Sequence, residues 1–167
     1  MSWRIELLDR SHRRDDFDCG EESLNEFLRR YARQNDAKDI SRTYVLLEED
    51  NPDIVGYYTL CSGSVSFESM PDGKARKLPR YPIPTAHIAR LAVDGARQGE
   101  KLGSLLLVDA LKRILEIAGK MGICAVTVQA LHDRAAAFYR AFGFQPLGDD
   151  PLHLFLLMET VRRLSDQ

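Results

Sequence analysis

The chain has 167 residues, 44% of them hydrophobic, which is enough for one domain with a buried core. The net charge of −2 gives no bulk attraction to nucleic acid, and three scattered cysteines favour reduced thiols in a cytoplasm over a disulfide framework. No run of about 18 apolar residues could cross a membrane, no signal-peptide core begins the chain, and the histidines lack metal-ligand spacing. We therefore expect a single cytoplasmic domain over residues 1–167, without a membrane segment or a metal.

The first part of the chain predicts three strands and one helix. The strands are expected where β-branched and aromatic residues alternate or cluster, at Trp3–Leu7, Thr43–Leu47 and Ile54–Cys61. The acids, Asn and Pro of residues 48–53 predict a hairpin connection between the last two strands.

The helix is expected after Ser23 and is amphipathic. Its apolar side is expected to contain Leu24, Phe27, Leu28 and Tyr31. Three basic residues lie on or near its exposed side, namely Arg29, Arg30 and Arg33. They form either an ordinary solvated face or the basic wall of a substrate groove.

Residues 62–84 contain several prolines, which argue against a continuous helix. The segment is expected to be a substrate-specific loop or a partly extended edge segment. From Lys74 to Lys101 the chain carries seven basic residues and two acidic ones. This cluster is either a solvated loop or a surface that contacts an anion.

A strand, a glycine-bearing turn and a long helix are expected in the middle of the chain. Ile88–Val93 is an apolar run interrupted only by Arg90, and glycines occur at Gly95, Gly99 and Gly103. The helix that follows separates an apolar face from a charged one. Such a turn offers backbone N–H groups and the positive end of a helix to an anion, although plain loop glycines would give the same pattern. The turn matches neither a P-loop nor a dinucleotide-binding pattern.

The last part of the chain predicts a strand at Ala125–Ala130, a helix ended by Phe142-Gly-Phe144, and a strand at His153–Met158 followed by a charged tail. Strands on both sides of a long helix predict a mixed α/β sheet.

Two motifs in this order resemble the GNAT acetyltransferase superfamily. They are Arg90-Leu-Ala-Val93 followed by Gln98-Gly-x-x-Leu-Gly103, and Phe138-Tyr139-x-x-Phe-Gly-Phe144. The resemblance implies an α/β (α+β) fold with a mixed, mostly antiparallel central sheet flanked by helices. It also implies a loop that binds the pyrophosphate of acetyl-CoA between the central strand and the long helix.

Within that superfamily the chain is most similar to the TacT/AtaT-like acetyltransferase toxins of type II toxin–antitoxin systems. The shared features also include Phe17-x-Cys-Gly-x-x-x-Leu24, Arg42-Thr-Tyr-Val45 and Gly56-Tyr-Tyr-Thr-Leu60. The resemblance implies acetylation of the α-amino group of aminoacyl-tRNA, a block of translation, a cognate antitoxin of the ribbon–helix–helix type, and a homodimer.

The resemblance also implies roles for particular residues. Tyr139 would give a proton to the departing thiolate, and the backbone N–H of Val93 would polarise the thioester carbonyl. The acetyl-CoA site would be formed by Leu91, Ala92, Val93, Arg97, Gln98, Gly99, Glu100, Lys101, Leu102, Gly103, Ser104, Phe138 and Tyr139. The substrate site would be formed by Arg90, Arg29, Arg30, Arg33, Lys74, Arg76 and Lys77. Lys101 departs from the family pattern, because a glycine is usual there.

The chemistry leaves three functions open. The expected strand Thr85–Val93 carries no acid to act as general base, which favours an α-amine with a pKa of roughly 7.7 to 8.0 over a lysine amine. The alternatives are an acetyltransferase for small-molecule or protein amines, and a module that binds an antitoxin in a DNA-binding repressor complex. Arg90 either pairs with a carboxylate or faces the substrate.

Overall fold

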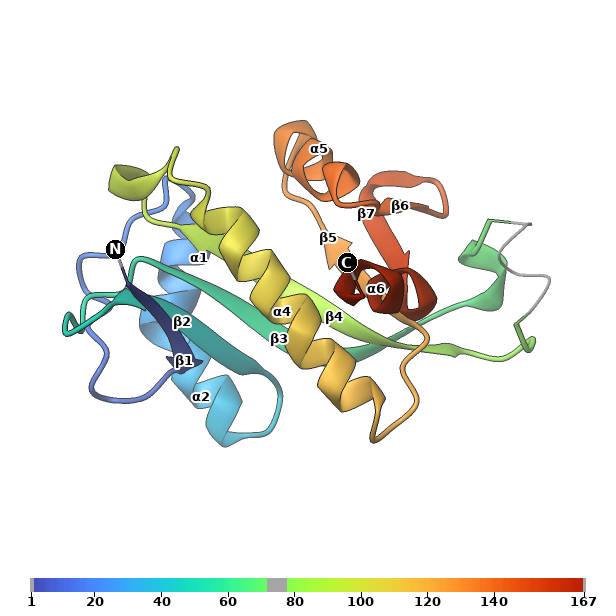
Figure 1. The fold of residues 1–167 in the computed structure, drawn as a ribbon, viewed down its shortest axis with the longest axis horizontal. Helices are drawn as coiled ribbons and strands as arrows, with labels where there is room; N and C mark the ends of the chain where they lie inside the picture. The colour runs from blue at the N-terminus through green and yellow to red at the C-terminus, as the bar shows by residue number, and fades with distance from the viewer. Residues whose placement is uncertain (1, 72–77, 167) are drawn as a thin grey trace. The chain divides into compact units, whose positions relative to one another are not determined.

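The computed structural model describes residues 2–71 and 78–166, whose strands form one seven-stranded sheet in the order β1-β2-β3-β4-β5-β7-β6 (Figure 1). The strands are β1 (Trp3–Leu7), β2 (Arg42–Glu48), β3 (Gly56–Val65), β4 (Ile83–Val93), β5 (Ala125–Gln129), β6 (Gln145–Leu147) and β7 (Asp150–Leu157). Strand β4 pairs with β5 in parallel, and the pairs β1–β2, β2–β3, β5–β7 and β6–β7 are antiparallel. The expected mixed, mostly antiparallel sheet is confirmed.

The helical segments occur between these strands. They are α1 (Glu22–Glu26), the π-helix η1 (Phe27–Tyr31), α2 (Ala32–Ala37), the 3₁₀ turns η2 (Phe67–Ser69) and η3 (Gly95–Arg97), α4 (Leu102–Ala118), α5 (Asp133–Ala141) and α6 (Met158–Ser165). The long helix expected after the glycine turn is α4. The chain divides into two compact units, which are Met1–Cys61 with Ala89–Ala110, and Ser62–Ile88 with Leu111–Gln167.

The first unit has its core between the α1–η1–α2 segment and strands β2 and β3. The buried side chains of this core include Phe17, Phe27, Leu28, Ala32, Val45, Leu47 and Tyr57. Tyr31 does not belong to it, contrary to the expected apolar face, because its side chain is 46% exposed. The π-helical turn is the cause. The N–H of Ala32 bonds to the carbonyl of Phe27, five residues earlier, so Ala32 takes the buried position.

Strand β3 also differs from the expected Ile54–Cys61. Pairing with β2 begins at Gly56, opposite Leu46, and extends to Leu60, and the strand itself runs to Val65. Ile54 and Val55 are buried ahead of the strand, so their apolar character reflects burial and does not mark the strand itself.

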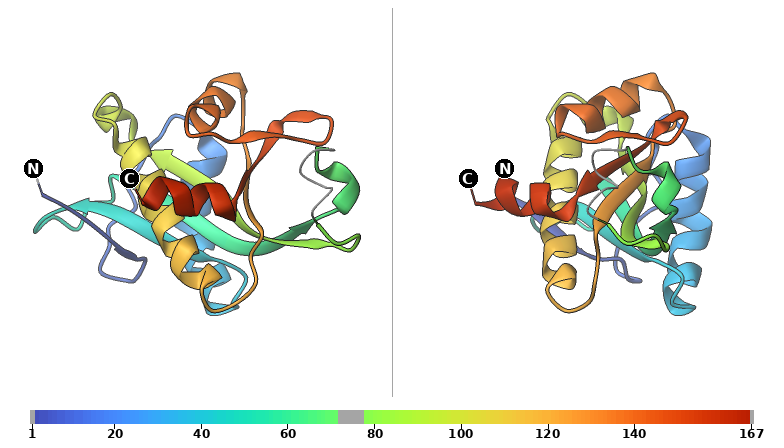
Figure 2. Two further views of the ribbon diagram at one scale, coloured as in Figure 1. Left: turned by 45° about the vertical axis from the view of Figure 1, so that its right-hand side comes forward. Right: turned by 90° about the vertical axis from the view of Figure 1, so that its right-hand side faces the viewer.

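The second unit contains a small core of Met70, Ile83, Leu147 and Phe155, and helices α5 and α6 both contact β7 (Figure 2). Residues 158–165, expected as the end of a strand and a charged tail, form helix α6. Its sequence is amphipathic, since Met158 and Val161 are buried while Arg162 and Arg163 are exposed. Strand β4 starts at Ile83 and includes Pro84, earlier than expected.

Candidate functional site

The loop between β4 and α4, residues 94–101, is fixed at its start by hydrogen bonds to two distant segments of the first unit. The N–H of Asp94 donates to the carbonyl of Val55 at 2.8 Å, and the N–H of Gly95 donates to the carbonyl of Asp18 at 2.8 Å. The Asp94 carboxylate accepts from the N–H groups of Ala96, at 2.9 Å, and Asp18, at 3.2 Å. The beginning of this β4–α4 loop is therefore fixed by hydrogen bonds to two separate segments, around Val55 and around Asp18.

The second half of the β4–α4 loop has an unusual backbone. Gly99 has φ of 91° and Lys101 has φ of 62°, so both adopt the left-handed conformation. A glycine is favoured there because a side chain crowds the backbone in this conformation. Lys101, the residue that departs from the family pattern, thus occupies the conformation for which glycine is suited.

The backbone N–H groups that follow are open. Among the described residues, no backbone hydrogen bond outside helices and strands is donated by residues 98–104, and the first amide to bond back is that of Leu105, to Lys101 at 3.3 Å. The first N–H groups of a helix have no partner within it, and α4 carries no acidic residue in its first turn. These amides and the positive end of the 17-residue helix α4 suit a phosphate or pyrophosphate.

Two side chains of the β4–α4 loop, Gln98 and Arg97, contact other parts of the protein. The Gln98 amide donates to the carbonyls of Cys19 and Val93, both at 3.4 Å. The Arg97 guanidinium contacts the carboxylates of Glu48 and Glu100 and lies over the Trp3 ring, at 5.1 Å from its centroid. These carboxylates raise the pKa of Arg97, and Arg97 lowers the pKa of Glu100, so the pair of Arg97 and Glu100 stays charged at neutral pH.

A pocket of about 380 Å³ lies beside Arg97 within the first unit. Its lining contains the acidic residues Asp15, Asp16, Glu48, Asp53 and Asp94. Its two basic residues are already paired, Arg13 with Asp53 at 2.9 Å and Arg97 with Glu48. This lining disfavours a phosphate on that side of Arg97.

Val93, whose N–H is expected to polarise the thioester, lies at the end of β4. Ala92 is buried, and Leu91 and Val93 are half-buried. The N–H of Val93 is the last in the strand, one residue before the loop starts.

Arg90 lies on an aromatic ring of the first unit's core. Its guanidinium carbon is 3.8 Å from the centroid of Phe27, a cation–π contact. Within residues 2–71 and 78–166, no carboxylate is found at ion-pair distance from Arg90. The positive charge is thus held in place without being neutralised, and it also opposes the rise in the pKa of Tyr57 that burial causes.

The other basic residues expected at the substrate site differ in their surroundings. Arg29 donates to the carbonyl of Phe17 at 2.5 Å and therefore ties its helix to the preceding segment. Arg30 is largely exposed, 3.6 Å from Glu26, and Arg33 is half-buried. Lys74, Arg76 and Lys77 lie outside the described residues.

Tyr139, the expected proton donor, belongs to the second unit. It lies near the end of α5, whose start is capped by His132, the ring of which accepts from the N–H of Ala135 at 3.2 Å. Its ring makes edge-on contacts with Phe138 and Phe144, at 5.2 Å and 5.6 Å between centroids. Burial raises the pKa of the Tyr139 hydroxyl above that of an exposed tyrosine, which is itself protonated at neutral pH.

Two residues near the β4–α4 loop were not expected from the sequence, Trp3 and Glu48. From the sequence, Trp3 is expected to be an ordinary strand residue and Glu48 to be part of an acidic hairpin connection. No local signal distinguishes them, because their importance comes from contact with Arg97.

Comparison with known proteins links this arrangement to a family. The model of the "Acetyltransferase (GNAT) family" matches residues 5–144. The chain is 43% identical over 148 residues to a "tRNA-acetylating toxin" of Mycobacterium tuberculosis, which covers 89% of this chain and 87% of that protein.

Two solved structures are similar over nearly their whole length. AtaT complexed with acetyl-methionyl-tRNAfMet has a TM-score of 0.91 and 32% identity, covering 98% of this chain and 99% of that one. A tyrosine-to-phenylalanine mutant of the AtaT toxin, bound to the C-terminus of the antitoxin AtaR and acetyl-CoA, has a TM-score of 0.83 and 30% identity, covering 100% of both chains. In the part of the chain that the structure describes, no helix is long and apolar enough to span a membrane, and no cluster of side chains suits a metal ion.

Proposed function

Because the chain belongs to the acetyltransferase (GNAT) family, we propose that it is an N-acetyltransferase toxin that moves an acetyl group from acetyl-CoA to the α-amino group of aminoacyl-tRNA and so blocks translation. The observation that carries the proposal is the strand–loop–helix arrangement from β4 to α4, with its open backbone amides. The likeness to a tRNA-acetylating toxin and to AtaT with acetyl-methionyl-tRNAfMet supports the choice of acceptor.

The β4–α4 loop fits the pyrophosphate of acetyl-CoA. The amides of residues 99–104 supply donors, the start of α4 supplies positive potential, and Gly99 has open space where a side chain would project. Lys101 is exposed and adds a positive charge next to these amides. Acetyl-CoA supplies the activated acetyl group as a thioester.

The protein's part in the reaction is to orient the reactants and to handle charge and protons. The N–H of Val93 donates to the thioester carbonyl oxygen as negative charge develops there. The amide C–N bond forms as the C–S bond breaks, and the Tyr139 hydroxyl, which is protonated at neutral pH as any tyrosine is, gives its proton to the departing sulfur. The proton that the amine nitrogen loses restores the Tyr139 hydroxyl through solvent. The acceptor α-amine, with a pKa of roughly 7.7 to 8.0, is partly neutral at physiological pH and needs no strong base.

Arg90 is the best candidate for contact with the acceptor end of the substrate. Its charge is not neutralised by a carboxylate among the described residues, and its stacking on Phe27 fixes the direction of the guanidinium. Arg30 and Arg33, with Lys74, Arg76 and Lys77, would contact phosphates further along the RNA. Arg29 would act mainly through its bond to Phe17.

An antitoxin partner is part of the proposal, because AtaT was solved with the C-terminus of the antitoxin AtaR. An antitoxin of the ribbon–helix–helix type, a homodimer and a cytoplasmic location are proposed with it. Replacement of Tyr139 by Phe should leave antitoxin binding intact while abolishing acetylation.

The experiment that tests the function is transfer from labelled acetyl-CoA by the purified protein. The acceptors are total aminoacyl-tRNA, deacylated tRNA and a panel of free amines. Label confined to aminoacyl-tRNA supports the proposal. Label on free amines alone would replace it with a small-molecule acetyltransferase.

A further inference from the structure

Arg97 contacts three residues from three parts of the chain, Glu100, Glu48 and Trp3. Within the loop, its Nε and Nη2 donate to the two carboxylate oxygens of Glu100, at 2.7 Å and 3.2 Å. Its Nη1 donates to the carboxylate of Glu48, and the guanidinium also lies over Trp3. All three nitrogens of the guanidinium are therefore engaged, and its side chain is only 23% exposed.

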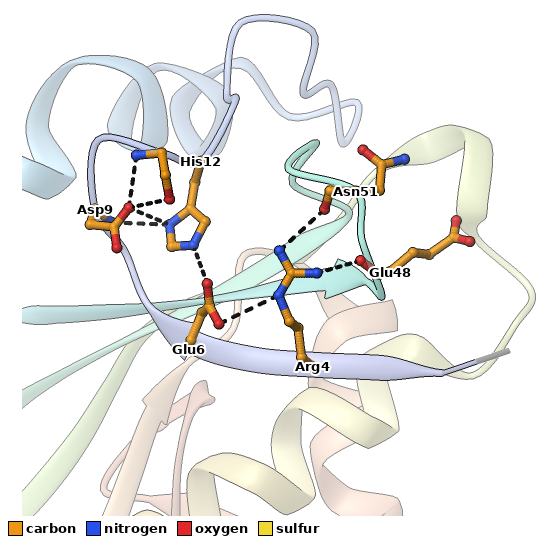
Figure 3. Close-up of polar contacts among 7 residues, drawn as sticks. Arg4, Glu6, Asp9, His12, Glu48 and Asn51 are labelled. Atoms are coloured by element: carbon orange, nitrogen blue, oxygen red, sulfur yellow. Dashed lines mark hydrogen bonds and ion pairs between the residues drawn. The ribbon is translucent and has the colours of Figure 1, made fainter.

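The two partners outside the loop form a firm anchor. Trp3 begins β1, Glu48 ends β2, and the two residues are directly opposite in the β1–β2 pairing. Arg4 donates to the backbone carbonyl of Glu48 at 2.7 Å, so it contacts Glu48 through the main chain and not through the carboxylate that Arg97 contacts (Figure 3).

Arg4 is itself held by further contacts along the same edge of the first unit. It lies 3.4 Å from the carboxylate of Glu6, and the other oxygen of that carboxylate is 2.6 Å from the Nε2 of His12 (Figure 3). The His12 ring is buried, and its Nδ1 accepts from the N–H of Asp9 at 3.0 Å. The anchor that Arg97 reaches is thus cross-linked to the rest of the N-terminal segment.

The charges around Arg97 oppose a direct role in phosphate binding. Two carboxylates already balance its positive charge, and five acidic residues line the pocket beside it. A phosphate in the pocket beside Arg97 would be repelled by these carboxylates. A phosphate at the open backbone amides of the loop and of α4 would not meet this repulsion.

We infer that Arg97 is a positioning residue: it clamps the β4–α4 loop to the β1–β2 edge, and the backbone amides of the loop bind the acetyl-CoA phosphates in its place. The inference rests on the proposed function, because it concerns how the same loop binds acetyl-CoA. It replaces the direct cofactor contact that the sequence suggested for Arg97.

The test compares two substitutions for which the two roles predict different outcomes. Isothermal titration calorimetry of acetyl-CoA is made with the wild-type protein, Arg97→Met, Glu48→Gln and the control Arg13→Met. Arg13 lines the same pocket and forms an ion pair, but that pair does not involve the loop. If Arg97 is a clamp, Arg97→Met weakens binding about five- to tenfold and Glu48→Gln weakens it in the same direction, while Arg13→Met changes it less than about twofold.

The opposite pattern overturns the inference. If Arg97 binds a phosphate directly, Glu48→Gln frees the guanidinium and leaves acetyl-CoA binding unchanged or tighter. Direct binding would also make Arg97→Met reduce the salt dependence of the dissociation constant, whereas a clamp leaves that dependence unchanged. In steady-state assays the clamp predicts a raised KM for acetyl-CoA with kcat retained at saturation.

Two further measurements distinguish loss of the clamp from a general loss of folding. Thermal unfolding of each variant is measured without acetyl-CoA. If Arg97→Met unfolds early, Arg97→Lys takes its place, since it keeps the charge but not the bidentate contact. A clamp predicts intermediate acetyl-CoA affinity for Arg97→Lys, and wild-type affinity would contradict it. If the wild-type protein itself does not bind acetyl-CoA, the proposed function fails and the inference with it. If the wild-type protein binds acetyl-CoA, and Arg97→Met and Glu48→Gln bind it as tightly as the wild type does, only the inference fails.

Discussion

At the scale of single residues, Lys101 is the clearest departure from a standard backbone. Its φ of 62° places a side chain in a conformation that costs an L-residue about 1–2 kcal/mol. Lys101→Gly should therefore raise the free energy of unfolding, by about 0.5–1 kcal/mol after the greater entropy of glycine in the unfolded chain is subtracted. Urea unfolding measures this change.

The matched control is Lys101→Ala, which removes the charge and keeps the β-carbon. It should leave the free energy of unfolding nearly unchanged. An equal gain from Ala and Gly would mean that charge, and not backbone conformation, sets the stability of this part of the loop.

Tyr139 gives a prediction about catalysis with little change in stability. Tyr139→Phe keeps the ring contacts with Phe138 and Phe144 but removes the proton donor. We expect kcat to fall about 10²–10⁴-fold, while the midpoint of urea unfolding stays close to that of the wild type. Full acetyl transfer by this variant, in the assay with aminoacyl-tRNA, would exclude the proposed role.

At the scale of elements, Gly56 at the start of β3 lies too close to α4 and β4 to carry a side chain. A β-carbon added at Gly56 would lie 2.9 Å from Cδ1 of Leu106 in α4 and 3.0 Å from the carbonyl oxygen of Ala92 in β4. Leu106 can shift, but the backbone oxygen cannot move without disturbing the end of β4. Gly56→Ala should cost about 1–3 kcal/mol in urea unfolding.

Gly122→Ala is the control for this position, because a β-carbon there meets no atom within 4 Å. It should change the free energy of unfolding by less than about 0.5 kcal/mol. A similar loss at both positions would show that the cost at Gly56 does not come from crowding.

The elements themselves were largely predictable, and the errors have physical causes. Strand β1 and helix α4 follow from alternation and from a helical apolar face. The π-helical turn at Phe27–Tyr31 was missed because it changes the number of residues per turn without any change in composition. Helix α6 was missed because Met158 continues the apolar run of β7. The change from the two-residue period of a strand to the 3.6-residue period of a helix therefore falls inside this apolar run.

At the scale of the whole molecule, buried tyrosines in both units predict a loss of stability at high pH. Burial raises the pKa of Tyr57 and of Tyr139 above the value of 10.0 for an exposed tyrosine. Their contribution is therefore fully present below pH 10 and is lost as the pH rises above it, since the unfolded chain ionises first. Urea unfolding at pH 8 and pH 10.5 measures the fall, which should be smaller in Tyr139→Phe.

The proposed RNA substrate predicts a strong salt dependence despite the net charge of −2. The KM for aminoacyl-tRNA should rise steeply with salt because phosphate contacts release counterions. Arg30→Met and Arg33→Met should each reduce the slope of log KM against log salt by about 0.7, the value for one contact to a single strand. A flat response in the wild type would contradict the RNA-binding role of these arginines.

The backbone of the candidate site was predictable where it depends on local sequence, and its side-chain contacts were not, because they depend on distant residues. Resemblance located the β4–α4 loop, and the left-handed backbone at Lys101 agrees with the glycine that is usual there. The partner of Arg97, Glu48, is 49 residues away, and the partner of Asp94, Asp18, is 76 residues away. No pattern in one sequence identifies which of many acids a basic residue will meet.

Those long separations also have a consequence for folding. A contact between residues far apart in the chain closes a large loop, and its entropic cost is met only when much of the surrounding structure has formed. The β4–α4 loop depends on such contacts with Asp18, Glu48 and Trp3, so it should take shape late, after the N-terminal strands are in place. A partly synthesised or partly folded chain should therefore be inert toward acetyl-CoA. For a protein proposed to arrest the ribosomes that make it, activity would begin only once the molecule is nearly complete.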